Sequence, residues 1–274
     1  MQYKILASDL DKTLLNNDGY VSRENWAAIE KLYKMGVQFV PTTGRSFKEM
    51  PRQLQDSPFI RYYITSNGAA VYDKETGRSY DFGIRGELAK YVLDTIYQYP
   101  INLFFHTENN TFTEQSTHNA ETYREFHLND YWIPYALSMV TPKQELKQFA
   151  YRVPYYESLT AFFKNREDLL ECMAEFAQNE QLFITQTDPW NVEVFSAQAG
   201  KGKSIHLLAE LLGVPVEATI GVGDSLNDTT LIKDAGLGLA VSNALPEIKA
   251  LADAVICSNE EHCVDYILRN YFSE

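Results

Sequence analysis

Cysteine is scarce in this sequence, and so are the features of secreted and membrane proteins. Three cysteines occur in 274 residues, Cys172, Cys257 and Cys263. Their odd number and spacing fit neither a disulfide framework nor a zinc motif. No apolar run approaches the roughly 18 residues that a membrane span needs, and residues 1–9 contain too short an apolar stretch for a signal peptide. These absences predict reduced thiols, no membrane partner and a cytoplasmic location.

An excess of positive charge is also absent. The sequence has 24 Lys and Arg against 37 Asp and Glu, which gives a net charge of −13. A chain this acidic is not expected to bind nucleic acid, because it lacks the basic surface that follows a phosphate backbone. Hydrophobic residues make up 45% and charged residues 22%, as is typical of a packed globular protein. At roughly 150 residues per domain, the length predicts about two domains or one large α/β unit.

Short apolar runs alternate with helical patterns at both ends of the chain. The strands expected near the N-terminus are residues 3–8, 37–40 and 62–65. Those expected near the C-terminus are residues 218–222, 237–241 and 254–257, separated by helices at 204–212, 227–234 and 246–252. This alternation predicts an α/β fold, with a Rossmann-like parallel sheet built from right-handed βαβ units.

The middle of the chain is less regular and richer in aromatic pairs. Alternating stretches at 181–185 and 191–195 accompany helical patterns at 87–97 and 166–176. We interpret residues 84–195 as an inserted α+β domain, and residues 1–83 and 196–274 as the two segments of one core domain.

Asp9 and Asp11 directly follow the first expected strand. Carboxylates at i and i+2 of an extended chain face the same side, about 6.6 Å apart, and can share one cation. Ligands of open α/β sheets bind outside the carboxyl ends of the strands, which is where this pair lies. A solvated turn is the alternative, since Asp is common there.

Two further polar loops follow expected strands. In residues 42–45, Thr-Thr-Gly-Arg, hydroxyl and amide groups before a helix can hold a phosphate, although Thr-Gly is also ordinary capping chemistry. In residues 221–228, Asp224 can give a hard cation a third carboxylate, while Asn227 and Asp228 open a helix whose N-terminus favours anions. Capping alone could explain Asp224 or Asn227, but not polar loops after three strands.

A lysine-containing loop begins the next helix. Residues 197–204 match G-x-x-x-x-G-K-[ST], except that Ala197 replaces the first Gly. In this interpretation Lys203 would bind nucleotide phosphates and Asp224 would support magnesium, as in a P-loop NTPase. That hypothesis leaves the aspartates of the first loop without a role.

The four loops together, in this order, resemble the motifs of the haloacid dehalogenase superfamily of phosphatases. The matching segments are Asp9-Leu-Asp-Lys-Thr-Leu-Leu, Thr42-Thr-Gly-Arg, Lys201-Gly and Gly223-Asp-Ser-Leu-Asn-Asp. The similarity extends to Ser66-Asn-Gly-Ala, Gly236-Leu-Gly-Leu-Ala-Val-Ser-Asn-Ala and Ala252-Asp-Ala-Val. The pattern is similar to the Cof-type subfamily, whose large C2-type α+β cap is inserted between the second and third motifs. The core matches motif by motif, while the cap matches by size and position.

This resemblance implies a phosphatase that uses Mg²⁺ to hydrolyse small phosphorylated metabolites, such as sugar phosphates, through an aspartyl-phosphate. It implies that Asp9 is the nucleophile and a metal ligand. Asp11 would be the general acid and base, and its backbone carbonyl would bind the metal. Asp224 would complete the protein ligands, and Asp228 would hold a metal-bound water. The groups implied to bind the phosphoryl oxygens are Thr43, the amides of Leu10 and Gly44, Lys201 and Asn227.

Lys12 departs from the family, which usually has Gly in its D-x-D-G-T pattern. Its side chain must point away from the phosphate or add a positive charge beside it. The cap histidines His106, His118 and His127 are interpreted as structural, as are the aromatic pairs around them. A non-catalytic module that binds a sugar phosphate or a partner on the same fold is the alternative function, but such a module needs no pair of aspartates at 9 and 11.

Overall fold

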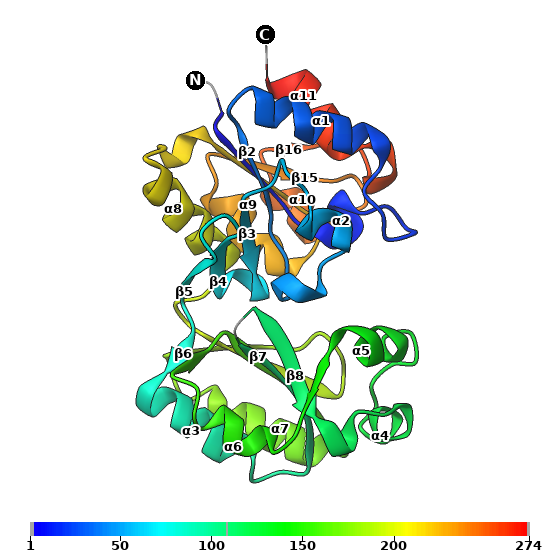
Figure 1. The fold of residues 1–274 in the computed structure, drawn as a ribbon, viewed down its shortest axis with the longest axis vertical. Helices are drawn as coiled ribbons and strands as arrows, with labels where there is room; N and C mark the ends of the chain where they lie inside the picture. Colours follow the sequence, from blue (N-terminus) through cyan, green and yellow to red (C-terminus); the bar gives the residue numbers. More distant parts are fainter. Residues whose placement is uncertain (1–2, 108, 273–274) are drawn as a thin grey trace. The chain divides into compact units, whose positions relative to one another are not determined.

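The chain divides into two compact units. The computed structural model describes residues 3–107 and 109–272 (Figure 1). The core unit comprises Met1–Arg45, Met50–Tyr80 and Gly200–Glu274, and the inserted unit comprises Ser46–Glu49 and Asp81–Ala199. Within the described ranges, no helix is both long enough and apolar enough to cross a membrane.

A five-stranded parallel sheet forms the centre of the core unit. Its strand order is β16-β15-β14-β1-β2. The bounds are β1 Ile5–Ser8, β2 Gln38–Pro41, β14 Thr219–Gly223, β15 Leu237–Ala240 and β16 Ala254–Val255. Because both faces are covered, the central strands are continuous apolar runs. Ser8 pairs with Pro41 on one side and Val222 on the other, so the carboxyl ends of β1, β2 and β14 meet at one edge.

Six helices of the core unit accompany this sheet within the described residues. They are α1 Arg23–Lys34, α2 Arg52–Gln55, α8 Lys201–Leu212, α9 Thr229–Asp234, α10 Pro246–Leu251 and α11 Cys263–Tyr271. Ser22 caps α1 by accepting a hydrogen bond from the backbone N–H of Asn25. Ile205 and Leu208 of α8 pack with Ile5 and Val40 of the sheet in one buried cluster. In Figure 1, α1 and α11 lie side by side.

The third expected strand belongs to a different sheet. β3 (Tyr62–Thr65) pairs antiparallel with β4 (Ala70–Asp73), and β5 (Arg78–Asp81) completes a three-stranded sheet. A short turn, Ser66–Gly68, reverses the chain between β3 and β4. β3 meets the parallel sheet through an isolated parallel bridge between Thr42 and Ile64. The strand predicted at residues 62–65 is therefore present, but its ladder is antiparallel, and its parallel pairing with the main sheet is limited to this bridge.

The inserted unit contains a six-stranded sheet of order β12-β13-β11-β7-β8-β9, antiparallel except between β8 and β9. Its strands are β7 Ile101–Thr107, β8 Asn110–Glu114, β9 Thr141–Lys143, β11 Ser158–Phe163, β12 Leu182–Thr185 and β13 Asn191–Ser196. β6 (Ile84–Arg85) and β10 (Tyr155–Tyr156) form a separate pair. The helices are α3 Gly86–Ile96, α4 Ala120–Glu125, α5 Ile133–Met139, α6 Leu146–Ala150 and α7 Arg166–Phe176.

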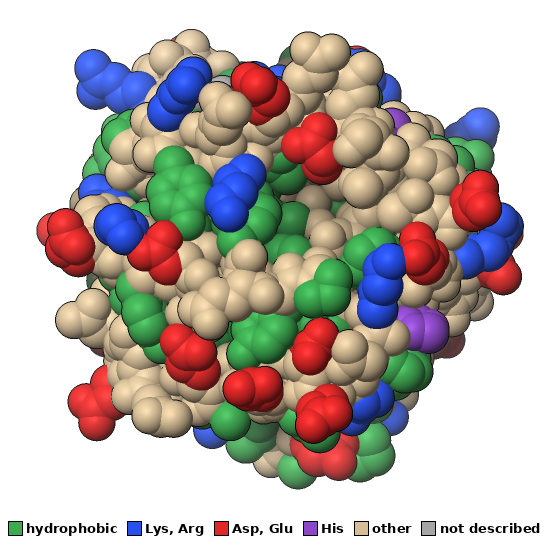
Figure 2. Space-filling view, turned by 90° about the horizontal axis from the view of Figure 1, so that it is seen from below, with side chains coloured by type: hydrophobic (Ala, Val, Ile, Leu, Met, Phe, Trp, Pro, Cys, Tyr) green, Lys and Arg blue, Asp and Glu red, His purple; other side chains and the backbone are tan. Residues whose placement is uncertain are grey.

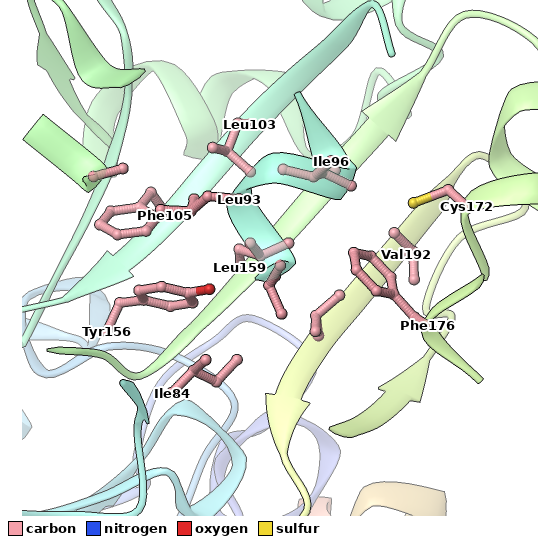
Figure 3. Packing of buried hydrophobic residues seen from close by; sticks show 14 of the residues in the cluster. Ile84, Leu93, Ile96, Leu103, Phe105, Tyr156, Leu159, Cys172, Phe176 and Val192 are labelled. Atoms are coloured by element: carbon pink, nitrogen blue, oxygen red, sulfur yellow. The ribbon is translucent and has the colours of Figure 1, made fainter. Parts of the chain in front are cut away.

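The two faces of this sheet differ in composition. One face packs under α3 and α7 through a fully apolar cluster, in which Leu103, Phe105 and Leu159 meet Ile96 and Phe176 (Figure 3). The alternate residues of the same strands point to the opposite face. There, Phe104 and Phe162 pack with residues of α4 and α5.

The predicted fold class is confirmed, since a parallel α/β core accompanies an α+β insertion. The helix predicted at 166–176 coincides with α7. Cys172, Cys257 and Cys263 are free, as predicted. On the face shown in Figure 2, Lys and Arg side chains are scattered among acidic and hydrophobic ones and are not gathered into a stripe.

Candidate active site

Three aspartates converge at the carboxyl edge of the parallel sheet. Asp9 follows β1, and Asp224 and Asp228 follow β14. One oxygen atom from each lies within 4.8 Å of the others. All three residues are buried. Carboxylate oxygens grouped in this way are the ligands that Mg²⁺ binds in proteins.

A buried lysine partly neutralises this group. The Nζ atom of Lys201, the first residue of α8, lies 2.6 Å from Asp9 Oδ1 and 2.6 Å from Asp228 Oδ1. Burial alone would lower the pKa of Lys201, but Asp228 and Asp9 raise it above its ordinary value, which keeps the ammonium charged. Lys203 is exposed. The nucleotide-loop hypothesis assigned the phosphate role to Lys203, whereas Lys201 is the lysine within the carboxylate group.

The net charge of this group is nevertheless negative, because it contains three carboxylates and one ammonium. Burial raises the pKa of Asp9 well above its ordinary value, and Asp228 adds to this shift while Lys201 opposes it. Burial and Asp228 raise the pKa of Asp224 to about 6. Both shifts express the cost of negative charges that are buried close together. A divalent cation would supply the missing charge, so the residues present fit Mg²⁺.

Asp228 is already fully engaged by hydrogen bonds. Its Oδ1 accepts from Lys201, and its Oδ2 accepts from the backbone N–H groups of Asp224, at 3.0 Å, and Ser225, at 3.1 Å. Any side chain at Gly223 would clash with the Asp228 carboxylate, so this close approach requires glycine. Asp224 Oδ1 accepts a bond of 3.1 Å from the hydroxyl of Thr13. Asp228 is therefore suited to orient its neighbours.

Asp11 lies outside the carboxylate group. Its two oxygens accept from Arg45, with Nε to Oδ2 at 3.0 Å and Nη2 to Oδ1 at 2.6 Å. The Asp11 side chain is 49% exposed. β1 ends at Ser8, and the chain turns within Leu10–Leu14, where the backbone of Asp11 is extended and that of Lys12 is left-handed. The Asp11 side chain therefore faces Arg45, apart from the three grouped carboxylates, and its sharing of a cation with Asp9 stays a prediction. Arg45 was not predicted as a site residue, although it closes the Thr-Thr-Gly-Arg motif.

Lys12 has a left-handed backbone, with φ of 61°. Glycine adopts this conformation without strain, which explains why the family pattern has Gly at this position. The side chain of Lys12 is exposed, and its backbone carbonyl accepts a 2.7 Å bond from the Asn243 side chain. The positive charge of Lys12 slightly opposes the rise in the pKa of Asp224, which burial and Asp228 cause.

A second polar group joins the loops that follow β2, β3 and β14. The Asn67 Oδ1 atom accepts a 3.0 Å bond from Asn227 Nδ2. A Cβ at Gly44 would lie 3.0 Å from the same Asn67 oxygen, so glycine permits this approach. Thr43 is buried, and its hydroxyl accepts from the backbone N–H of Arg45 at 3.2 Å. The structure thus brings Thr43, Gly44 and Asn227 to the same edge as Asp9.

Asn67 was not among the predicted site residues. It lies in the left-handed turn after β3, with φ of 52°. The signal that could have identified it is Ser66-Asn-Gly-Ala, a segment that resembles the family but to which no role was assigned. The backbone carbonyl of Gly68 accepts a 2.8 Å bond from the Ser204 hydroxyl, which ties this turn to α8. Leu10, the predicted site residue between Asp9 and Asp11 in the first loop, is fully buried.

Comparison with known proteins supports the same family. Residues 6–268 match the haloacid dehalogenase-like hydrolase family. The chain is 30% identical to the phosphatase YwpJ of Bacillus subtilis, over 97% of this chain and 99% of the relative. It is 29% identical to the 5-amino-6-(5-phospho-D-ribitylamino)uracil phosphatase YcsE of the same organism, over 98% of this chain and 95% of the relative.

A solved structure agrees in fold. A haloacid dehalogenase-like hydrolase from B. subtilis superimposes with a TM-score of 0.75 at 28% identity, covering 97% of this chain and 99% of that one. The predicted family and the predicted enzyme class are both confirmed, because the family matches over nearly the whole chain and the curated relatives are phosphatases. The chain belongs to the haloacid dehalogenase-like hydrolases.

Proposed function

We propose that this chain is a Mg²⁺-dependent phosphatase that hydrolyses small phosphate monoesters through an aspartyl-phosphate on Asp9. The observation that carries this proposal is the buried group of three carboxylates around one ammonium. Residues 1–83 and 196–274 would form the hydrolase core and residues 84–195 the cap. We also expect the enzyme to act in the cytoplasm.

Asp9 is the proposed nucleophile. An oxygen of its carboxylate attacks phosphorus, and the bond between phosphorus and the ester oxygen breaks. Lys201 holds the Asp9 carboxylate through its contact with Oδ1, which leaves Oδ2 for the attack. A second attack at phosphorus, by water, then releases inorganic phosphate and regenerates the Asp9 carboxylate.

Asp11 is the proposed proton donor and acceptor. It would give a proton to the leaving alkoxide and later remove one from the attacking water. Its position on Arg45, outside the buried group, supports a role separate from that of Asp9. Arg45 would set the direction of the Asp11 carboxylate through its two parallel hydrogen bonds.

The phosphoryl group would be held by donors from several loops. We assign this role to the following groups: the Thr43 hydroxyl, the amides of Leu10 and Gly44, Lys201 and the Asn227 side chain. Preorganised donors of this kind stabilise the charge that develops on the transferring oxygens. Asn67 would position Asn227 by accepting its amide hydrogen bond.

Asp9, Asp224 and the backbone carbonyl of Asp11 would hold Mg²⁺, and Asp228 would orient the water around it. When bound, the cation would neutralise the excess negative charge of the carboxylate group and of the phosphate dianion. The relative YcsE is named for a phosphorylated ribitylamino-uracil, which supports a small phosphorylated metabolite as the substrate class here.

The test is phosphate release from sugar phosphates, nucleotides and p-nitrophenyl phosphate, with Mg²⁺ and then with excess chelator. We expect release that the chelator abolishes and that Asp9→Asn lowers by at least about a thousandfold, since a nucleophile is lost. Tight binding of a sugar phosphate with no release would favour the binding module. ATP hydrolysis that requires Lys203 and tolerates Asp9→Asn would favour the nucleotide-loop hypothesis.

A further inference from the structure

The turn that follows Asp9 contains a residue in an unfavourable backbone conformation. Lys12 has φ of 61° and ψ of 11°. In this left-handed region the Cβ atom of an L-residue crowds the following carbonyl oxygen, so glycine adopts it without strain and lysine does not. Such a conformation persists only where the surrounding structure holds it. The contacts of the Lys12 backbone therefore decide the shape of the turn.

Asn243, in the loop that follows β15, makes such a contact. Its Nδ2 donates a 2.7 Å hydrogen bond to the backbone carbonyl of Lys12. Its Oδ1 accepts a 3.0 Å bond from the backbone N–H of Asn259. Because a backbone N–H can only donate, the second bond fixes which end of the amide faces Lys12. The Asn243 side chain is thus held at both ends, although the residue is exposed.

The loop that carries Asn243 is anchored beside the carboxylate group. The backbone N–H of Leu245 donates a 2.9 Å bond to the backbone carbonyl of Asp224. The side chain of Asp224 in turn accepts a bond from the hydroxyl of Thr13, which lies in the turn. Asn243 therefore joins the turn after the proposed nucleophile to the loop that carries a proposed metal ligand.

Two buried side chains near the C-terminus contact the same turn. The Nδ2 atom of Asn259 donates a 3.1 Å bond to the carbonyl of Leu15. The thiol of Cys263 donates a 3.2 Å bond to the carbonyl of Thr13. Of these three donors, Asn243 is the one that bonds to the left-handed residue.

We propose that Asn243 is a positioning residue, whose bond to the Lys12 carbonyl keeps the turn left-handed and so sets the direction of the Asp11 carbonyl. The Asp11 carbonyl belongs to the peptide group before Lys12, and the Lys12 carbonyl belongs to the group after it. If φ of Lys12 changed from 61° to the usual helical range, one group would rotate against the other by more than about 100°. This inference rests on the proposed function, in which the Asp11 carbonyl binds Mg²⁺.

The first experiment measures Mg²⁺ binding by calorimetric titration. We expect Asn243→Ala to weaken binding about tenfold, because loss of the hydrogen bond lets the turn leave its left-handed conformation. At saturating Mg²⁺, kcat for p-nitrophenyl phosphate should also fall about tenfold, since Asp11 moves with the turn. KM should change less than about threefold, because Thr43, Lys201 and Asn227 stay in place.

A glycine background and a matched asparagine separate positioning from general effects. In Lys12→Gly, the further change Asn243→Ala should weaken Mg²⁺ binding less than about twofold, since glycine keeps the left-handed turn without strain. Asn270 is also exposed, and it donates a 2.8 Å bond to the backbone carbonyl of Tyr266 in α11. Asn270→Ala should leave Mg²⁺ binding and kcat unchanged. An equal loss in both backgrounds, or no loss in Asn243→Ala, would overturn the proposal.

Hydrogen exchange without Mg²⁺, followed by NMR, tests the turn apart from catalysis. The backbone N–H groups of Leu14 and Leu15 donate to the carbonyls of Asp9 and Leu10, at 3.2 and 2.8 Å. We expect these two amides to exchange about tenfold faster in Asn243→Ala than in the wild type. Equal exchange would overturn the positioning role even if the enzyme is active. Faster exchange, with no phosphate release from any ester by the wild type, would support that role while contradicting the phosphatase.

Discussion

Two groups of acidic side chains lie in this molecule, and they differ in what neutralises them. The core group, Asp9, Asp224 and Asp228, includes two carboxylates that pair with a fully buried lysine, Lys201. The pocket group, Glu49, Asp188 and Glu193, shares its cavity with aromatic rings and with a histidine whose pKa burial lowers. The first arrangement suits a cation and a phosphoryl dianion. The second suits a neutral or cationic hydrogen-bond donor.

Removing the lysine should break the core group. Lys201→Met leaves Asp9 and Asp228 buried without their partner, so we expect the free energy of unfolding to fall by about 3–5 kcal/mol. Phosphate release should also be lost. Urea denaturation with chelator present measures the effect on stability. Lys203→Met is the matched control from the same loop, and it should change stability by less than about 0.5 kcal/mol. Similar losses in both variants would contradict this account.

Added Mg²⁺ should distinguish the two acidic groups. The core group lacks positive charge, so Mg²⁺ should stabilise the wild type by about 2.7 kcal/mol at a hundredfold excess over its dissociation constant. Asp224→Ala should lose this gain, whereas Glu193→Gln in the pocket group should keep it. Thermal unfolding with and without Mg²⁺ measures the gain. Equal gains in the wild type and Asp224→Ala would show that the cation binds elsewhere.

A side-chain hydrogen bond from Asn227 to Asn67 joins two loops at the same edge of the sheet as the core group. Asn67→Gly removes the bond to Asn227 but keeps a residue that tolerates the left-handed backbone. One hydrogen bond is worth about 0.5–1.5 kcal/mol, so KM and the inhibition constant for inorganic phosphate should rise roughly two- to tenfold. Asn67→Ala should add backbone strain of about 1–2 kcal/mol without a further rise in KM. Unchanged constants in both variants would remove Asn67 from the site.

Acid should destabilise the folded protein through His106, which lines the same pocket as the pocket group. Its pKa in the folded state lies below the unfolded value of about 6.5. The unfolded state therefore binds more protons below that pH, and the contribution of neutral His106 to stability is lost as the pH falls. Wild type should lose stability relative to His106→Gln by up to about 1.4 kcal/mol per pH unit between pH 6.5 and 5. Parallel urea-denaturation curves across that range would contradict the burial of a neutral imidazole.

The sequence allowed much of the core to be predicted. Strand ends were visible because apolar runs such as Ile5–Ser8 stop at polar residues, and parallel strands bring those ends to one edge. Asp9 and the loop of Asp224 and Asp228 could therefore be predicted to lie at one edge, while Lys201 was predicted from the resemblance to the family's motifs.

The remaining features depend on contacts between distant residues. The pairing of Asp11 with Arg45 follows from the turn at Leu10–Leu14. No periodicity of apolar residues in the sequence predicts this turn. The antiparallel pairing of β3 depends on left-handed residues at Ser66 and Asn67. The pocket of the inserted unit depends on the register between β7, β11 and β13, which local sequence does not encode.

The central claim is that Asp9 carries the phosphoryl group during turnover. The most direct test is to quench the enzyme in acid during hydrolysis of p-nitrophenyl phosphate with Mg²⁺, and to locate the phosphoryl group by peptide mass spectrometry. We predict a phosphorylated peptide that contains Asp9 in the wild type and none in Asp9→Asn. Phosphate on a different residue, or full turnover by Asp9→Asn, would contradict the account.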